Sequence, residues 1–127
     1  MKVVDASAMI DVLTGSPRST KLLPLLDDDL FAPDLLIVEV FSFLKRMGTA
    51  RRLTHAATEQ LALALREAPI EYMHTWPYAE RIWSWRQNVS PYDAAYVALA
   101  EDLGAPLVTT DSRLGRAASG LVVVLTV

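Results

Sequence analysis

Two aspartates each follow a short apolar segment of this chain. Asp5 comes after residues 3–4, and Asp111 comes after residues 107–110. If both segments are strands of one parallel sheet, their carboxyl ends meet at the same edge, where the ligand crevices of open α/β sheets lie. Two carboxylates held together repel each other unless a cation or a proton lies between them. The pair therefore indicates a site for a divalent metal ion.

A third acid, Glu39, interrupts the apolar segment 35–44, which has the pattern of a helix buried on nearly all sides. Glutamate is rarely buried without a partner. Its side chain therefore either reaches water at an edge of the helix or points into an acidic pocket.

The fourth acid, Asp93, lies in the first turn of a helix that Ser90 and Pro91 are expected to open. The spacing from Ser90 to Asp93 fits a capping box, which is a purely structural explanation for the acid. The alanines that follow also allow this helix to approach the sheet closely. That approach would bring Asp93 near the carboxyl ends of the strands.

Each acid alone has an ordinary explanation, because aspartate is a good helix cap. The four together are more specific, since three of them would lie at helix N-termini, where the helix dipole favours negative charge. Mg²⁺ and Mn²⁺ prefer such oxygen ligands, and they activate water for phosphodiester hydrolysis. The expected ligands are Asp5, Glu39, Asp93 and Asp111.

Other side chains allow two interpretations each. Arg46, on the same helix face as Glu39, is either a contact for a scissile phosphate near the metal or an ordinary surface arginine. Trp76 and Trp83 share a helical face, and a core or dimer contact is preferred over stacking on unpaired bases. Asp11 is predicted to be a solvated surface acid that points away from Asp5.

Strands and helices alternate along the sequence, which predicts βαβ units, right-handed crossovers and a mainly parallel sheet. The predicted strands are residues 2–5, 30–32, 70–73, 107–110 and 121–125, the last one covered on both faces. The predicted helices are 6–14, 19–28 (interrupted by Pro24), 33–47 (starting at Pro33 and stopped by Gly48), 50–67 (one helix or a helical hairpin, with Thr54 as a candidate cap), 76–87, 91–103 and 112–118.

Length and composition set the remaining limits. The 127 residues are 52% hydrophobic, which suits one α/β domain spanning 1–127, and the formal net charge of −3 is compatible with a phosphate-bearing substrate without predicting one. The absence of cysteine excludes disulfides, thiolate zinc sites and cysteine nucleophiles. No segment has the length and hydrophobicity of a signal peptide core or a membrane span. A soluble, cytoplasmic protein is therefore expected.

These motifs resemble the PIN-domain family of metal-dependent ribonucleases, and most of all the VapC toxins of bacterial toxin–antitoxin pairs. The resemblance runs through residues 4–7, 39–40, 93–100 and 107–114. It implies a three-layer α/β/α sandwich with a parallel five-stranded sheet, usually as a homodimer. It also implies an RNA substrate, no membrane, and a VapB antitoxin whose tail enters the acidic groove.

The resemblance further implies roles for individual residues. Asp5, Glu39, Asp93 and Asp111 would hold magnesium, and Ser7 and Thr109 would be polar supports of the site. One departure is Ser42, where many relatives carry asparagine. The departure affects that supporting contact and not the four acids.

Three rival functions remain open at this point. One is a PIN nuclease of RNA processing or DNA structures that has no antitoxin, and another is a catalytically silent PIN module used for binding. The third is a phosphoacceptor receiver domain, which needs a lysine after a late strand. The only lysines are Lys2, Lys21 and Lys45, so the receiver domain is disfavoured.

Overall fold

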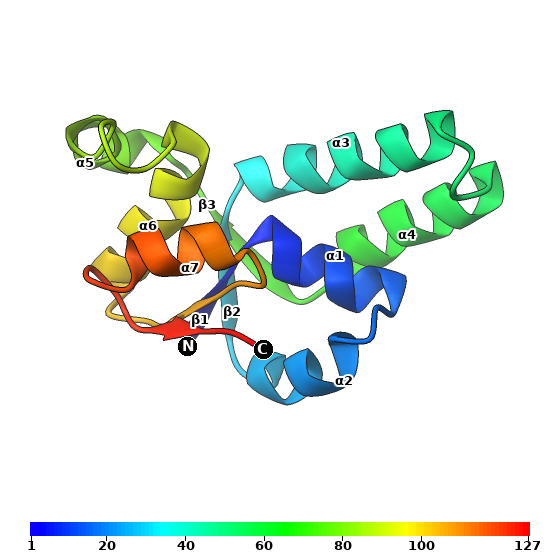
Figure 1. Cartoon of the computed structure of the whole chain (residues 1–127), viewed down its shortest axis with the longest axis horizontal. Coiled ribbons are helices and arrows are strands. Elements are labelled where there is room, and N and C mark those ends of the chain that lie inside the picture. Colours follow the sequence, from blue (N-terminus) through cyan, green and yellow to red (C-terminus); the bar gives the residue numbers. More distant parts are fainter.

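A five-stranded sheet forms the centre of the structure, a computed structural model that describes all residues 1–127 (Figure 1). Every strand runs parallel to its neighbours, in the order β3-β2-β1-β4-β5. The strands are β1 (Lys2–Val4), β2 (Leu30–Pro33), β3 (Ile70–Met73), β4 (Leu107–Val108) and β5 (Val124–Leu125). The predicted α/β fold with a parallel five-stranded sheet is therefore confirmed.

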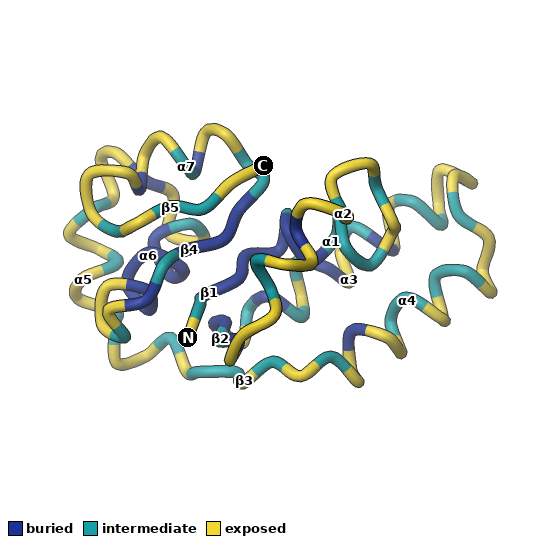
Figure 2. Tube along the Cα trace, turned by 90° about the horizontal axis from the view of Figure 1, so that it is seen from below, coloured by how far each residue is buried: buried dark blue, intermediate teal, exposed yellow.

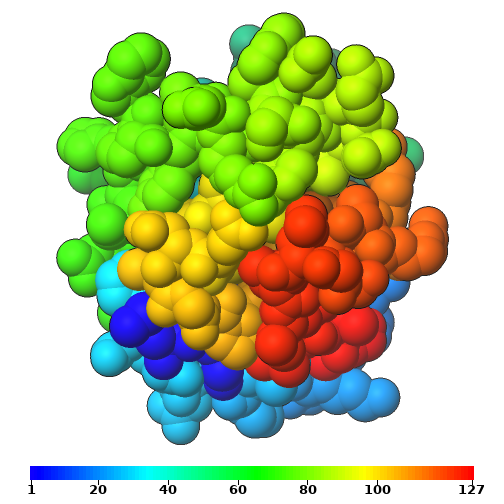
Figure 3. Space-filling view, turned by 90° about the vertical axis from the view of Figure 1, so that its left-hand side faces the viewer, coloured from blue at the N-terminus to red at the C-terminus, as the bar shows by residue number.

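The helices cover both faces of this sheet. The α-helices are α1 (Ala6–Thr14), α2 (Ser19–Leu22), α3 (Leu35–Thr49), α4 (His55–Glu67), α5 (Ala79–Ser84), α6 (Pro91–Leu103) and α7 (Ser112–Ala118); the 3₁₀-helices are η1 (Leu23–Leu26) and η2 (Trp76–Tyr78). The strand order reverses direction after β3, so right-handed crossovers place α1 to α4 on one face and α5 to α7 on the other (Figure 1). Figure 3 shows the second face, where η2 and α5 lie beside the C-terminal part of α6 and the end of the chain.

The register of the two central strands sets the position of the site. Val4 pairs with Val108, and the Asp5 N–H donates to the Val108 carbonyl at 3.1 Å. Asp5 and the segment after Val108 therefore leave the sheet together, at the carboxyl edge that the sequence predicted.

The core is centred on β1, β4 and α6, as the buried parts of the trace in Figure 2 show. Every residue from 94 to 100 of α6 is buried, and the helix packs against β1, β2 and β4. Four of these seven residues are alanines. Their small side chains allow the close approach to the sheet that the sequence analysis expected.

Two helices begin and end as predicted. Asp5 caps α1 by accepting from Ala8 N–H, and Gly15 ends it with φ 63°. Ser90 caps α6 by accepting from Asp93 N–H, and Gly104 ends it with φ 59°. Both glycines occupy the left-handed region, which other residues adopt at a cost.

The prediction for residues 33–47 was wrong at both ends and in its burial. Pro33 ends β2, and the pairing continues through Asp34 N–H, which donates to the Met73 carbonyl at 3.0 Å. The helix α3 starts at Leu35 and runs through Gly48 to Thr49. Only one face of α3 is buried, because α1 and α4 pack against a single side of the helix. Val38, on the other side, is 63% exposed.

The remaining differences are shorter elements. Residues 109–110 and 121–123 are not part of strands, and β5 is a half-buried edge strand that pairs only with β4. Segment 19–28 divides into α2 and η1 at Pro24, which lacks an N–H to continue the helix. Segment 76–87 divides into η2 and α5.

No helix is long and apolar enough to span a bilayer.

The central position of α6 predicts the effect of a cavity there. Leu99 is fully buried, and replacing it with alanine keeps a good helix former while removing packed atoms. Leu99→Ala should lower the free energy of unfolding by about 3 kcal/mol, the usual cost for such cavities. Urea denaturation followed by circular dichroism measures this change. The control is Leu63→Ala at a 47% exposed position of α4, which should change the value by less than about 0.5 kcal/mol.

Candidate functional site

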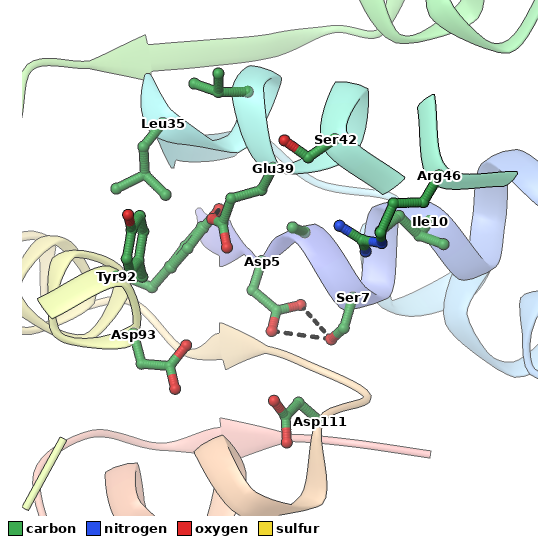
Figure 4. Close-up of a pocket in the computed structure, with 13 residues that line it drawn as sticks. Asp5, Ser7, Ile10, Leu35, Glu39, Ser42, Arg46, Tyr92, Asp93 and Asp111 are labelled. Atoms are coloured by element: carbon green, nitrogen blue, oxygen red, sulfur yellow. Dashed lines mark hydrogen bonds between the residues drawn. The ribbon is translucent and has the colours of Figure 1, made fainter. Parts of the chain in front are cut away.

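The four predicted acids line one cleft at the carboxyl edge of the sheet (Figure 4). The cleft has a volume of about 540 Å³ and lies between α1, α3, the start of α6 and the start of α7. Its charged and polar lining residues are Asp5, Ser7, Glu39, Ser42, Arg46, Asp93 and Asp111. The acids come from four separate parts of the chain, so only the fold brings them together.

Asp5 is the most buried acid of the site, with 3% of its surface exposed. Its carboxylate accepts hydrogen bonds from Ser7 Oγ at 2.7 and 2.9 Å, from Ala8 N–H at 2.9 Å and from Thr109 Oγ1 at 2.5 Å. Burial nevertheless raises the pKa of Asp5 from 3.8 to about 6, although these donors oppose the shift. The negative charge of Asp111 raises it further. The site therefore stabilises the charged form of Asp5 incompletely.

Asp111 combines a structural role with a free oxygen. Its Oδ1 accepts from Arg113 N–H at 2.9 Å and from Leu114 N–H at 3.3 Å, which caps α7. Its backbone N–H donates to Thr109 Oγ1 at 3.0 Å. The second carboxylate oxygen receives no hydrogen bond from the protein and is available to a ligand in the cleft.

Asp93 also directs its carboxylate to the cleft. Its backbone N–H donates to Ser90 Oγ at 3.2 Å, but its carboxylate accepts no hydrogen bond from the Ser90 backbone N–H, so only half of the capping box forms. Burial raises the pKa of Asp93 and the charge of Asp111 adds to that shift, whereas the Ser90 hydroxyl and Arg113 oppose it. These two acids therefore repel each other across the cleft.

Glu39 points from α3 into the cleft, as the second of its two sequence interpretations requires (Figure 4). The buried hydroxyl of Tyr96 donates to its Oε1 at 2.6 Å. Burial raises the pKa of Glu39, and the Tyr96 hydrogen bond opposes the shift. Sequence reasoning missed Tyr96; the only signal was its place one helical turn after Asp93.

The carboxylates give the cleft an oxygen-rich donor set. No three of them lie close enough in this structure to form a complete ligand group. Mg²⁺ commonly keeps several waters and binds through one or two carboxylates. The free oxygen of Asp111, the carboxylate of Asp93 and the incompletely stabilised charge of Asp5 therefore fit a hydrated Mg²⁺ or Mn²⁺.

Two other predictions for individual residues can now be compared with the structure. The guanidinium of Arg46 points toward the cleft (Figure 4) and forms no ion pair with the protein. Trp76 and Trp83 are 83% and 65% exposed, so neither is a core residue, and the alternative of a dimer contact stays a prediction. They lie on η2 and α5 and line one pocket with Pro91 of α6.

The prediction that Asp11 is a solvated surface acid was also wrong. Its carboxylate accepts from Thr110 Oγ1 at 2.6 Å and lies 3.8 Å from the guanidinium of Arg18. Only 15% of its side chain is exposed. The spacing from Asp5 gave no signal for this contact, because the partner comes from the loop after β4.

A parallel α/β/α sandwich with a carboxylate-lined cleft at its carboxyl edge is the arrangement that the sequence motifs predicted. The PIN domain model matches residues 2–120 of the chain. The chain therefore belongs to the PIN-domain family.

Characterised relatives point to one branch of that family. Ribonuclease VapC1 of Mycobacterium tuberculosis is 41% identical over 121 residues, which cover 91% of this chain and 89% of the relative. Ribonuclease VapC3 of the same species is 39% identical and covers 91% and 85%. The chain is thus similar to ribonucleases named VapC.

Solved structures share the fold. VapC20 of M. tuberculosis, described as a toxin that cleaves the sarcin-ricin loop, superposes with a TM-score of 0.71 at 19% identity and covers 96% of this chain and 97% of its own. VapBC2 of Rickettsia felis, solved with a DNA fragment from its promoter, gives a TM-score of 0.66 at 13% identity, with coverage of 98% and 97%.

The raised pKa of Asp5 predicts how the stability of the metal-free protein depends on pH. The folded state binds the Asp5 proton more tightly than the unfolded state. The contribution of this proton to the free energy of unfolding is therefore fully present below pH 4 and is lost as the pH rises through about 6. Asp5→Asn removes this loss. The free energy of unfolding of the variant minus that of wild type should therefore increase by roughly 2–3 kcal/mol from pH 3.5 to pH 7.5.

Urea denaturation in EDTA at both pH values measures the gain, and the difference between the proteins cancels the contributions of Glu39 and Asp93. An equal difference at the two pH values would contradict the assignment of a raised pKa to Asp5.

Proposed function

We propose that this protein is a Mg²⁺-dependent endoribonuclease that acts in the cytoplasm as the toxin of a VapBC-type toxin–antitoxin pair. The observation that carries the proposal is the convergence of four carboxylates from distant parts of the chain on one cleft. The similarity to ribonucleases named VapC supports both the reaction and the RNA substrate.

In this proposal Asp5, Glu39, Asp93 and Asp111 would hold a hydrated metal ion. Mg²⁺ would supply activation of water and neutralisation of phosphate charge. Ser7 and Thr109 donate to the Asp5 carboxylate, which favours its charged form and fixes its orientation. Tyr96 does the same for Glu39. No protein nucleophile is required.

Arg46 is the proposed contact for the RNA backbone. Its free guanidinium lies at the rim of the cleft, seven residues and about two helical turns from Glu39. A planar guanidinium suits phosphate oxygens. This position would hold a phosphodiester beside the carboxylates and balance part of their charge.

The proposed partners are a VapB-like antitoxin and a second copy of the chain. The VapBC2 complex among the structural neighbours supports the antitoxin. Contiguous exposed apolar side chains mark surfaces that contact other proteins. Trp76 and Trp83 are both more than half exposed and line the same pocket, which supports a homodimer contact there.

The first test of this function is RNA cleavage by purified protein. Asp93→Asn should reduce cleavage in Mg²⁺ by about 100-fold or more, because losing a direct ligand should cost at least as much as losing a supporting residue. Asp5→Asn should act likewise, and EDTA should abolish wild-type cleavage. Sequencing of the RNA ends measures the cuts.

Asp102→Asn, at the far end of the same helix α6, is the matched control and should cleave as wild type does. Circular dichroism checks that every variant is folded. Undiminished cleavage by both the Asp5 and the Asp93 variants would reject the proposed active site.

The second test concerns the partners. Co-expression with the product of a neighbouring small gene should yield a stable complex in which RNA cleavage is inhibited, because the antitoxin would occupy the acidic cleft. Light scattering of the toxin alone and of the complex gives the number of copies of each chain. An active, monomeric protein that captures no such product would instead favour a PIN nuclease that has no antitoxin.

A further inference from the structure

Helix α1 holds the loop after β4 through two side chains that lie one turn apart. Ser7 Oγ accepts the backbone N–H of Thr110 at 3.1 Å. Asp11 Oδ2 accepts the hydroxyl of the same residue at 2.6 Å. Residues i and i+4 share one face of a helix, so Thr110 is fixed at its backbone and at its side chain by a single helix face.

The contact between Asp11 and Thr110 is well suited to fixing geometry. A hydrogen bond to an ionised carboxylate is shorter and stronger than one between neutral groups. The only cation near Asp11 is Arg18, at 3.8 Å, and its side chain is 58% exposed. Exposed ion pairs contribute little, so Thr110 is the main partner that orients this carboxylate.

Thr110 directly precedes Asp111, whose other side is fixed by capping α7. The backbone of Asp111 is therefore held from both directions, and its free carboxylate oxygen keeps its direction into the cleft. Neither Asp11 nor Thr110 lines that cleft. Any effect they have on the site is therefore indirect, and Asp111 is the residue next to Thr110 whose free carboxylate oxygen faces the cleft.

We propose that Asp11 is a positioning residue that, through the hydroxyl of Thr110, holds the Asp111 carboxylate in place for the metal. This inference rests on the proposed Mg²⁺ site. It assigns a role outside the cleft to an acid that touches neither the metal nor the RNA.

The experiment compares Mg²⁺ binding by calorimetry in the absence of RNA for four variants and wild type. Asp11→Ala and Thr110→Val each remove the hydrogen bond and should weaken Mg²⁺ binding by about 10-fold, as the loss of other supporting contacts does. Asp11→Asn and Thr110→Ser keep an acceptor and a hydroxyl, and should retain most of the affinity. The double variant Asp11→Ala/Thr110→Val should be no weaker than either single one, because both remove the same contact.

Kinetics supply a second readout. At limiting Mg²⁺ the kcat for RNA cleavage should fall in Asp11→Ala and recover in Asp11→Asn, while KM for RNA stays unchanged because Arg46 and the rim are intact. The control is Asp102→Ala on α6, which removes a comparable carboxylate acceptor, because Asp102 accepts from the Tyr78 hydroxyl of η2 at 2.8 Å. It should leave Mg²⁺ binding unchanged.

The outcomes separate this inference from the function on which it rests. Wild-type Mg²⁺ affinity in the near-isosteric variant Thr110→Val would overturn the positioning role alone. Equal weakening in Asp11→Asn and Asp11→Ala would also overturn it, since the charge rather than the hydrogen bond would then matter. A wild-type protein that binds no Mg²⁺ and cleaves no RNA would overturn the proposed function and the inference together.

Discussion

The burial of one carboxylate, Asp5, is the constraint on which the rest of the site depends. A charged group with 3% exposure loses most of its hydration, and several kcal/mol of that loss must be offset by donors or by a cation. The protein supplies three kinds of donor: a helix N–H, a serine on α1 and a threonine after β4. The raised pKa shows that these donors do not fully compensate. The remaining charge favours a proton or a cation beside Asp5.

The short central strands make this arrangement feasible. Strand β1 has three residues and β4 has two, so Asp5 and Thr109 follow paired residues of adjacent strands. If β4 continued to residue 110, as the sequence predicted, the Thr110 N–H would be used in a hydrogen bond between strands. In the structure that N–H is instead available to Ser7. The early end of β4 thus releases the backbone and hydroxyl groups that organise the site.

The sequence predicted what depends on local pattern and missed what depends on the meeting of distant segments. Apolar runs, caps and glycines predicted the five strands, the bounds of α1 and α6, and the edge at which the acids gather. The burial of α3 was wrong because a run of apolar residues does not reveal how many neighbours a helix has. Asp11 and Tyr96 were missed because their partners, Thr110 and Glu39, lie 99 and 57 residues away.

The ambiguity between capping and metal binding disappears once the two oxygens of each carboxylate are considered separately. Asp111 caps α7 with Oδ1 alone, and Asp93 contributes only its backbone N–H to the cap of α6. A serine or asparagine could satisfy the same N–H groups at position 111. Such a residue would cap the helix and yet lack the second anionic oxygen that faces the cleft. Helix capping therefore explains the position of this side chain, whereas only the cleft explains why it is an acid.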